Sequence, residues 1–237
     1  MKKNFLIIVL LIISGAVLAQ KGYKPKNLGG FDKKKYHFGF MLGFNSADVY
    51  VDRKASTGFQ DSLLAVNSRN APGFNLGIIT SVNFTKNVSL RFLPTLSFED
   101  RVLEYEFFAT PDSTTSYEKR IEFTYIDFPV NFKFRTDRLN NLAAYCLVGA
   151  RFRINMQSEK DVKNAIAEEI IVKAQRNDFA MEFGGGLDFF LPYFKFGIEL
   201  KMAVGIPNIL VEEDTQFSAP LQGLRSRTFM ISFTFEG

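Results

Sequence analysis

The chain has 237 residues, of which 46% are hydrophobic and 23% are charged, and this balance excludes an intrinsically disordered chain. It contains one cysteine and one histidine, which excludes a disulfide framework and a cysteine-rich zinc cluster. The net charge of +4 is too small to indicate a nucleic-acid-binding protein.

The first residues have the layout of a secretory signal peptide. Two lysines follow Met1, an apolar run covers residues 5–13, and Val17 and Ala19 place small residues at the −3 and −1 positions. The apolar run is short for a membrane-spanning helix, which needs roughly 20 residues. We therefore expect residues 1–19 to be removed by cleavage between Ala19 and Gln20, and the mature chain to leave the cytoplasm.

Residues 20–35 carry six lysines against a single acidic residue, Asp32, together with several glycines. This composition predicts a flexible basic tail. Its role stays open between a solvated leader without a partner and a segment that binds a partner or an anionic surface.

Residues 36–237 alternate between apolar and polar with a period of two, which is the pattern of β-strands. Eight strands are predicted, at about residues 37–44, 73–84, 88–99, 120–135, 145–155, 179–189, 194–204 and 228–235. Short turns are expected at 85–87, 136–141 and 191–192, and long loops at 46–72, 107–119, 158–177 and 207–224. This layout predicts an all-β fold, an eight-stranded antiparallel transmembrane β-barrel of the outer membrane. Its short turns and both termini are expected in the periplasm, and its long loops outside the cell.

The same alternation could belong to a soluble barrel, which points its apolar residues inward. Here the apolar face is rich in Phe, and an eight-stranded barrel has an interior only just wide enough for side chains. Small residues fit such an interior better. The glycines of the polar face stand at positions 39, 43, 77, 149, 184, 186 and 197. The polar face is therefore expected to line the lumen, and the apolar face to meet lipid.

The predicted lumen face carries seven basic and six acidic residues. Because a buried charge is costly unless it is paired, we expect a salt-bridged, filled lumen, with a proton or ion path as the alternative. The predicted network consists of Arg91, Glu99, Glu122, Asp127, Lys133, Arg135, Arg151, Arg153, Glu182, Asp188, Lys195, Glu199 and Lys201. No catalytic, metal or cofactor site is indicated. The lone His37 is expected to be structural, on the lumen face near the periplasmic end.

Two local features interrupt the strand pattern. Ile121, Phe123 and Tyr125 share one face of the fourth strand, but the parity of the apolar residues changes near Ile126. One extra residue there, a β-bulge, would restore the register. In the third long loop, apolar residues recur at helical spacing over residues 159–175, which favours a short helix or an extended hairpin.

The stretch Tyr125-Ile126-Asp127-Phe128-Pro129 resembles the Tyr–hydrophobic–acidic–hydrophobic–Pro strand of the small outer-membrane β-barrels of Bacteroidetes. The basic leader that runs into residues 35–48 is similar to the PorT (SprT) branch of that family. The resemblance covers nearly the whole mature chain. PorT-like proteins belong to the type IX secretion system, which exports proteins with a C-terminal sorting domain and, in gliding relatives, delivers surface adhesins.

The resemblance implies a non-enzymatic component of type IX secretion and gliding motility. Its expected partners are other proteins of that system and outer-membrane lipid, with no cofactor, nucleic acid or small-molecule substrate. Because a charge-filled barrel of eight strands is too narrow for a folded cargo, an accessory or assembly role is expected. Two alternatives stay open, a small-solute channel or ligand-binding surface protein, and an outer-membrane enzyme built on His37.

Overall fold

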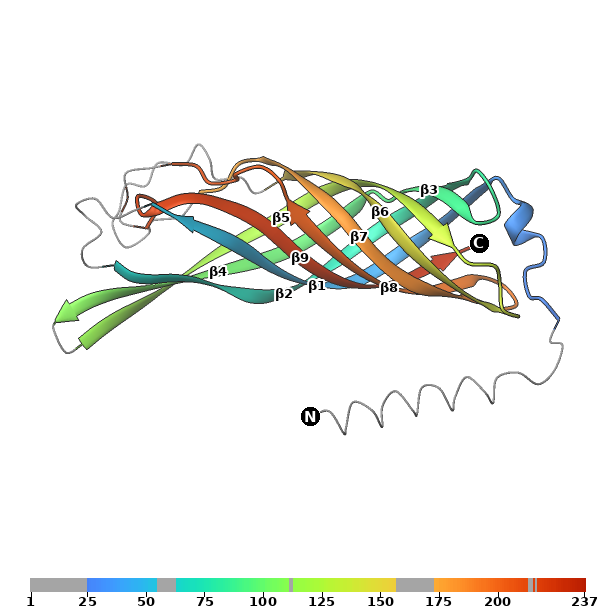
Figure 1. Cartoon of the computed structure of the whole chain (residues 1–237), viewed down its shortest axis with the longest axis horizontal. Helices are drawn as coiled ribbons and strands as arrows, with labels where there is room; N and C mark the ends of the chain where they lie inside the picture. Colours follow the sequence, from blue (N-terminus) through green and yellow to red (C-terminus); the bar gives the residue numbers. More distant parts are fainter. Residues whose placement is uncertain (1–24, 55–62, 111–112, 157–172, 213–214, 216) are drawn as a thin grey trace, which may run out of the picture.

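The computed structural model describes residues 25–54, 63–110, 113–156, 173–212, 215 and 217–237 (Figure 1). The predicted signal peptide, the start of the basic tail and residues 159–172 of the third long loop lie outside this part. None of the helices in this part has the length and hydrophobicity of a transmembrane helix. The described elements are the 3-10 helix η1 (Phe31–Lys33) and the strands β1 (Tyr36–Arg53), β2 (Leu63–Asn83), β3 (Val88–Phe92), β4 (Thr95–Thr110), β5 (Ser113–Arg135), β6 (Leu142–Asn155), β7 (Asn177–Phe190), β8 (Lys195–Gly205) and β9 (Leu221–Glu236).

These strands form one antiparallel sheet that closes on itself, because β1 pairs with both β2 and β9. Both β3 and β4 pair with β2 on one side and with β5 on the other. Their registers agree across the intervening Leu93 and Pro94, so β3 and β4 are two parts of one barrel strand. Pro94 has no N–H to donate to the ladder, which explains the interruption. The sheet is thus a barrel of eight strands, and the predicted fold class is confirmed.

The short turns gather at one end of the barrel, beside η1 and the C-terminus (Figure 1). We call this the terminal end and the opposite end the distal end. The predicted turns at 85–87, 136–141 and 191–192 are confirmed, since they join β2 to β3, β5 to β6 and β7 to β8.

At the distal end, the prediction of two of the long loops is wrong, because strands occupy most of their residues. Most of residues 46–72 belongs to β1 and β2, and most of residues 107–119 belongs to the β4–β5 hairpin. Five strands, β1, β2, β4, β5 and β9, therefore continue past the distal ends of β6, β7 and β8 (Figure 1). We call this part the distal extension, with residues 46–53, 63–72, 100–110, 113–124 and 221–227.

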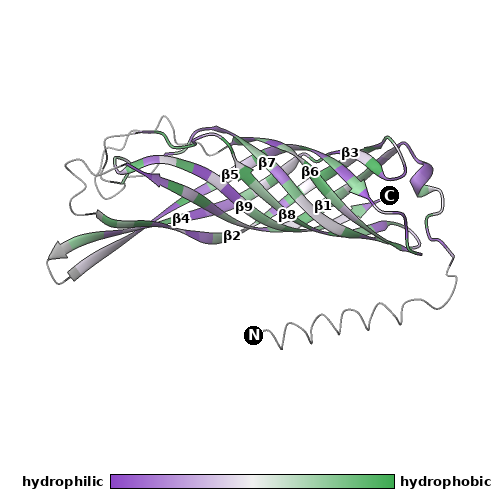
Figure 2. Cartoon of the chain, viewed as in Figure 1, coloured by the Kyte–Doolittle hydropathy of each residue, from purple (hydrophilic) through white to green (hydrophobic). Residues whose placement is uncertain are grey.

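Nearer the terminal end, every barrel strand exposes apolar side chains on the outer face. Apolar and polar residues alternate along these strands (Figure 2). We call this part the apolar band; in β5 it covers residues 126–134. Phe132 and Phe134 are exposed there, whereas Lys133 between them is buried. In the distal extension the same strand exposes Glu122 and buries Phe123.

The bulge predicted near Ile126 is wrong. β4 and β5 pair in one unbroken register from Phe107–Thr115 to Thr95–Asp127. Tyr125 and Asp127 therefore point to the same side, into the barrel, and both are buried. The parity of the apolar residues changes because the strand leaves the apolar band.

The interior of the distal extension is an apolar core. The segment between β8 and β9 covers it, since Leu210 pairs with Ala174 and the Tyr105 hydroxyl donates to the carbonyl oxygen of Phe217 at 2.9 Å. Burial raises the pKa of Tyr105 above its usual range. The core consists of Val49, Val66, Leu103, Tyr105, Ile121, Phe123, Tyr125, Ala174, Ile209, Leu210, Phe217, Leu221 and Leu224.

Candidate functional site

The interior at the level of the apolar band is charged, and we call it the charged lumen. Alternate residues of a strand point to the same face, so each strand that carries charges on its inner face aims them at the barrel axis. Seven acidic and seven basic residues define the charged lumen, and none is more than 4% exposed. They are Glu99, Asp127, Asp178, Glu182, Asp188, Glu199, Glu236, Arg91, Arg101, Lys133, Arg151, Arg153, Lys195 and Lys201.

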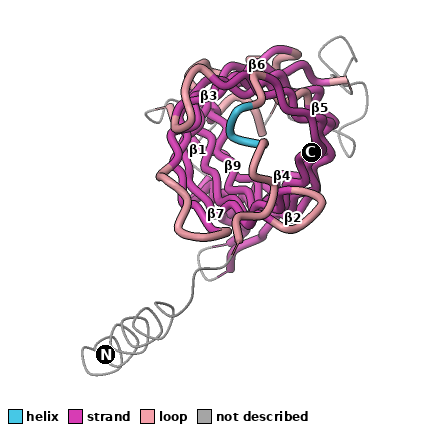
Figure 3. Tube along the Cα trace, turned by 90° about the vertical axis from the view of Figure 1, so that its right-hand side faces the viewer, coloured by secondary structure: helices cyan, strands magenta, loops and turns pink. Residues whose placement is uncertain are grey.

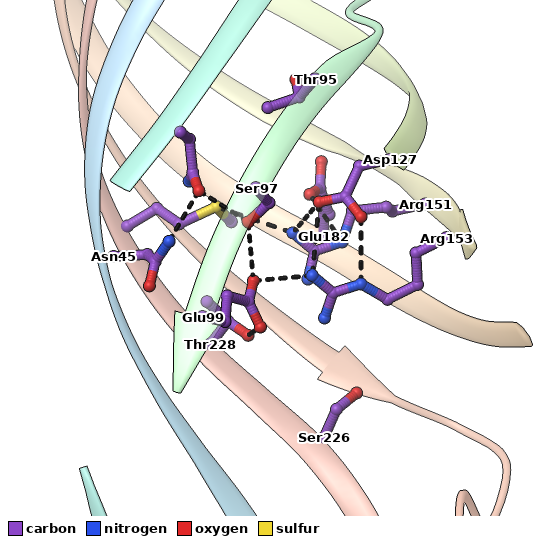
Figure 4. A network of polar contacts seen from close by, with 12 residues as sticks. Asn45, Thr95, Ser97, Glu99, Asp127, Arg151, Arg153, Glu182, Ser226 and Thr228 are labelled. Atoms are coloured by element: carbon purple, nitrogen blue, oxygen red, sulfur yellow. Dashed lines mark hydrogen bonds and ion pairs between the residues drawn. The ribbon is translucent and has the colours of Figure 1, made fainter. Parts of the chain in front are cut away.

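One group of charges lies toward the distal end and centres on Arg153 (Figure 4). The Arg153 guanidinium donates to Glu99 at 2.6 Å and to Asp127 at 3.1 Å. Arg151 lies 3.3 Å from Asp127 and 3.5 Å from Glu182. Each of these carboxylates therefore meets at least one guanidinium, which offsets the loss of hydration on burial.

A second group lies toward the terminal end. Arg91 donates to Glu199 at 2.6 Å, and the Tyr145 hydroxyl donates to the same carboxylate at 2.8 Å. A Cβ at Gly186 would lie 2.6 Å from the Tyr145 hydroxyl oxygen, so this glycine makes room for that hydrogen bond. Further ion pairs join Lys133 to Asp188 (2.8 Å), Lys195 to Glu236 (2.8 Å), Arg91 to Glu236 (3.2 Å) and Lys201 to Glu199 (3.3 Å).

Of the thirteen residues predicted for the lumen network, eleven lie in the charged lumen. Glu122 does not, and its prediction is wrong. It is exposed on the outer face of the distal extension, opposite Asp100 in the β4–β5 ladder. Arg135 is also elsewhere, because it lies at the terminal mouth and binds Asp32.

Three residues of the charged lumen were not predicted, namely Arg101, Asp178 and Glu236. Each continues the period-two pattern of inward positions beyond the predicted end of its strand. Arg101 follows Glu99, and Asp178 precedes Glu182 by two such positions. Extending the alternation to the full length of each strand would have found all three.

Residues 25–35, which we call the cap, lie over part of the terminal mouth; Figure 3 shows η1 inside the ring of strands. A flexible tail was predicted for residues 20–35, and this is wrong for the cap. Phe31 is 3% exposed, and its ring stacks on the ring of His37 with centroids 3.9 Å apart. It also meets the edge of Phe190 at 5.9 Å. One buried aromatic side chain therefore anchors the cap in the barrel mouth.

Polar contacts fix the rest of the cap. Asp32 accepts a hydrogen bond from Arg135 at 2.6 Å and lies 2.7 Å from Arg138. Asn27 donates from its backbone N–H to the side chain of Asn141 at 2.8 Å. The cap is therefore bound to the turn that joins β5 to β6. A cavity of about 20 Å³ remains under it, enough for about one water molecule.

His37 lies under the cap on the lumen face, where its Nε2 is 2.6 Å from the Asn83 side-chain nitrogen. In the part of the chain that the structure describes, no group of three or more His, Cys, Asp and Glu side chains is placed to hold a metal ion. The charged lumen thus lies between the apolar distal core and the cap, and its charges are engaged with one another.

The sequence matches the family described as "Outer membrane protein beta-barrel domain" over residues 19–211. The chain belongs to this family. It is an outer-membrane β-barrel protein, and its apolar band is the part that meets lipid. No curated protein matches the sequence.

Several solved outer-membrane barrels are similar to this chain at low identity. OprG from Pseudomonas aeruginosa is 9% identical with a TM-score of 0.46, over 85% of this chain and 95% of that chain. Neisserial surface protein A is 10% identical with a TM-score of 0.42, over 85% and 96%. Ail of Yersinia pestis is 17% identical with a TM-score of 0.40, over 86% and 100%.

Proposed function

We propose that this barrel is a non-enzymatic accessory or assembly factor of type IX protein secretion, and that it acts through contacts with other proteins of that system. The observation that carries this proposal is the closed interior. The charged lumen is filled with paired side chains, and it lies between the cap and the distal core. An interior of this kind favours a role for the outer surfaces of the barrel.

The link to type IX secretion rests on the sequence. Residues 125–129 and the first strand with its basic leader resemble the PorT branch of the Bacteroidetes barrels. The structure gives the first of these segments a physical role, because Asp127 binds two arginines of the charged lumen.

The proposal includes an orientation. Outer-membrane barrels have short turns on the periplasmic side and longer connections outside. The terminal end, with the cap and the three short turns, is therefore proposed to face the periplasm. The distal extension is proposed to face the exterior.

A clean deletion in the native organism, complemented in trans, tests this function. We expect sorting-domain cargo to accumulate in the periplasm of the deletion strain, while other outer-membrane proteins stay at normal levels. Complementation with the wild-type gene should restore export, and complementation with a Leu200→Arg variant, which carries a charge on the lipid face, should not. Normal cargo export in the deletion strain would contradict the proposal.

A further inference from the structure

We infer that the terminal end is a docking surface for an acidic surface of a partner protein. This inference deepens the proposed function and rests on it for the periplasmic placement of this end. The surface is built from the cap and the short turns, and it takes its chemistry from the basic residues gathered there.

Basic side chains outnumber acidic ones around the terminal mouth. The basic set consists of Lys26, Lys33, Lys34, Lys35, Lys86, Arg135 and Arg138. The acidic side chains beside them are Asp32, which is bound by Arg135 and Arg138, and Asp137, which pairs with Lys86 at 2.9 Å. Among the described residues, Lys26, Lys33 and Lys34 make no ion pair, and all three are exposed. They are therefore available to carboxylates of another molecule.

The cap holds these lysines at defined positions. The backbone N–H of Asn83 donates to the carbonyl oxygen of Lys35 at 2.8 Å, and its side chain donates to that of Lys34 at 3.0 Å. Phe31 beside them is buried in the mouth. Because the backbone of the cap is already ordered, binding of a partner here costs less conformational entropy than binding to a free tail.

The position of the lysines favours a protein over the membrane as the occupant. Lys33 belongs to η1 and Lys34 follows it, and this segment crosses the mouth inside the ring of strands (Figure 3). The outward rim of the same end carries exposed aromatic residues instead, namely Tyr36, Phe84 and Tyr193. Aromatic rings of this kind occupy the lipid interface of a barrel. The lysines of the cap therefore face the aqueous compartment, where charge complementarity selects an acidic partner surface.

Binding of a fluorescent poly-L-glutamate peptide to the full barrel in phosphatidylcholine nanodiscs tests this surface. The terminal variant carries Lys26→Glu, Lys33→Glu and Lys34→Glu. A matched control carries the same charge change at exposed distal positions, through Lys54→Glu, Arg120→Glu and Arg225→Glu. We expect the Kd to rise about tenfold for the terminal variant and to stay at the wild-type value for the control. Heat-modifiable gel mobility checks that all three barrels are folded. Equal Kd values for the terminal variant and the wild type would overturn the inference.

A second arm distinguishes a protein partner from lipid headgroups. An environment-sensitive dye is attached at Lys34→Cys in a Cys146→Ala background, in nanodiscs that contain phosphatidylglycerol and a headgroup-labelled nitroxide lipid. The same dye at Tyr193→Cys reports the lipid rim. We expect strong quenching at the rim and none at the cap. Equal quenching at both positions would show that the cap lysines lie among headgroups, and would overturn the inference in favour of lipid.

The two proposals fail in different ways. Normal export by the deletion strain would remove the secretion role and leave the difference in peptide binding unchanged. Equal peptide binding by all barrels would remove the docking surface and leave the export defect unchanged.

Discussion

The apolar band and the distal extension are built from the same strands with opposite polarity. In the band, Phe132 of β5 faces outward and Lys133 faces the lumen. In the extension, Arg120 of the same strand faces outward and Ile121 faces the core. A period of two therefore separates the two faces of a strand, but the medium around the barrel decides which of them is apolar.

The difference also changes what stabilises each region. In the band, lipid solvates the outer apolar side chains, and the interior relies on paired charges. In the extension, water solvates the outer charges, and the interior relies on apolar burial, as in a soluble domain. The same kind of substitution should therefore have unequal effects in the two regions.

The largest effect is expected from Arg153→Met in the charged lumen. It leaves Glu99 and Asp127 without their closest guanidinium, and removal of one partner from a buried ion pair destabilises a protein by about 3–5 kcal/mol. Urea titration of the barrel folded in phospholipid vesicles measures this loss. Arg120→Met, on the outer face of the extension, should change the stability by less than about 1 kcal/mol. Similar losses of stability for both variants would contradict the opposite polarity of the apolar band and the distal extension.

A charge on the outer face of the band should have the next largest effect. Leu200 is 48% exposed to the surroundings of the barrel, and an arginine at the bilayer midplane costs about 2–4 kcal/mol. The matched change in the extension is Ser116→Arg, at an exposed outer position, which should shift the stability by no more than about 0.5 kcal/mol. Both are compared by the fraction of barrel that inserts into vesicles. Insertion of Leu200→Arg at the level of Ser116→Arg would show that the band does not face lipid.

A smaller effect is expected from Tyr105→Phe in the distal core. The change removes the hydrogen bond to the carbonyl oxygen of Phe217 and keeps the ring, so a loss of about 1 kcal/mol is expected. Tyr117→Phe is the control, because the Tyr117 side chain is 46% exposed. If both variants unfold at the wild-type urea concentration, the Tyr105 hydrogen bond does not stabilise the core.

The smallest effect concerns pH. Asp48 lies on β1 just beyond the apolar band. Burial raises the pKa of Asp48, but hydrogen bonds from Ser68, Arg227 and the Val49 N–H outweigh burial, so the pKa lies below its usual range. A lowered pKa adds stability that is present above the unfolded pKa and is lost as the pH falls through the folded one. Asp48→Asn should therefore be less stable than wild type at neutral pH, with the difference shrinking below about pH 4. A difference that stays constant from pH 7 to pH 3 would contradict this role.

The comparison also shows how much of the molecule could be predicted from the sequence. The barrel, its short turns and most of the charged lumen follow from alternation, because the pattern repeats in every strand. The predictions for Glu122 and for the two long loops were wrong because they assumed that lipid surrounds the whole length of each strand. In the distal extension, water surrounds the strands instead.

The cap and the ion pairs needed the structure. Phe31 is a single apolar residue in a lysine-rich segment, so no periodic pattern predicts that it is buried. The ion pairs join residues far apart in the chain, such as Arg91 and Glu199, which are separated by 108 positions. Which opposite charges meet depends on the barrel register and on the space that glycines leave.

Single-channel recording of the purified wild-type barrel in planar bilayers tests the central claim most directly. The claim is that a lumen filled with paired charges, lying between the cap and the distal core, leaves the outer surfaces of the barrel to carry its function. A barrel of this kind should show no stable conductance above that of the bare bilayer. A steady ohmic conductance would contradict the closed interior and favour a small-solute channel.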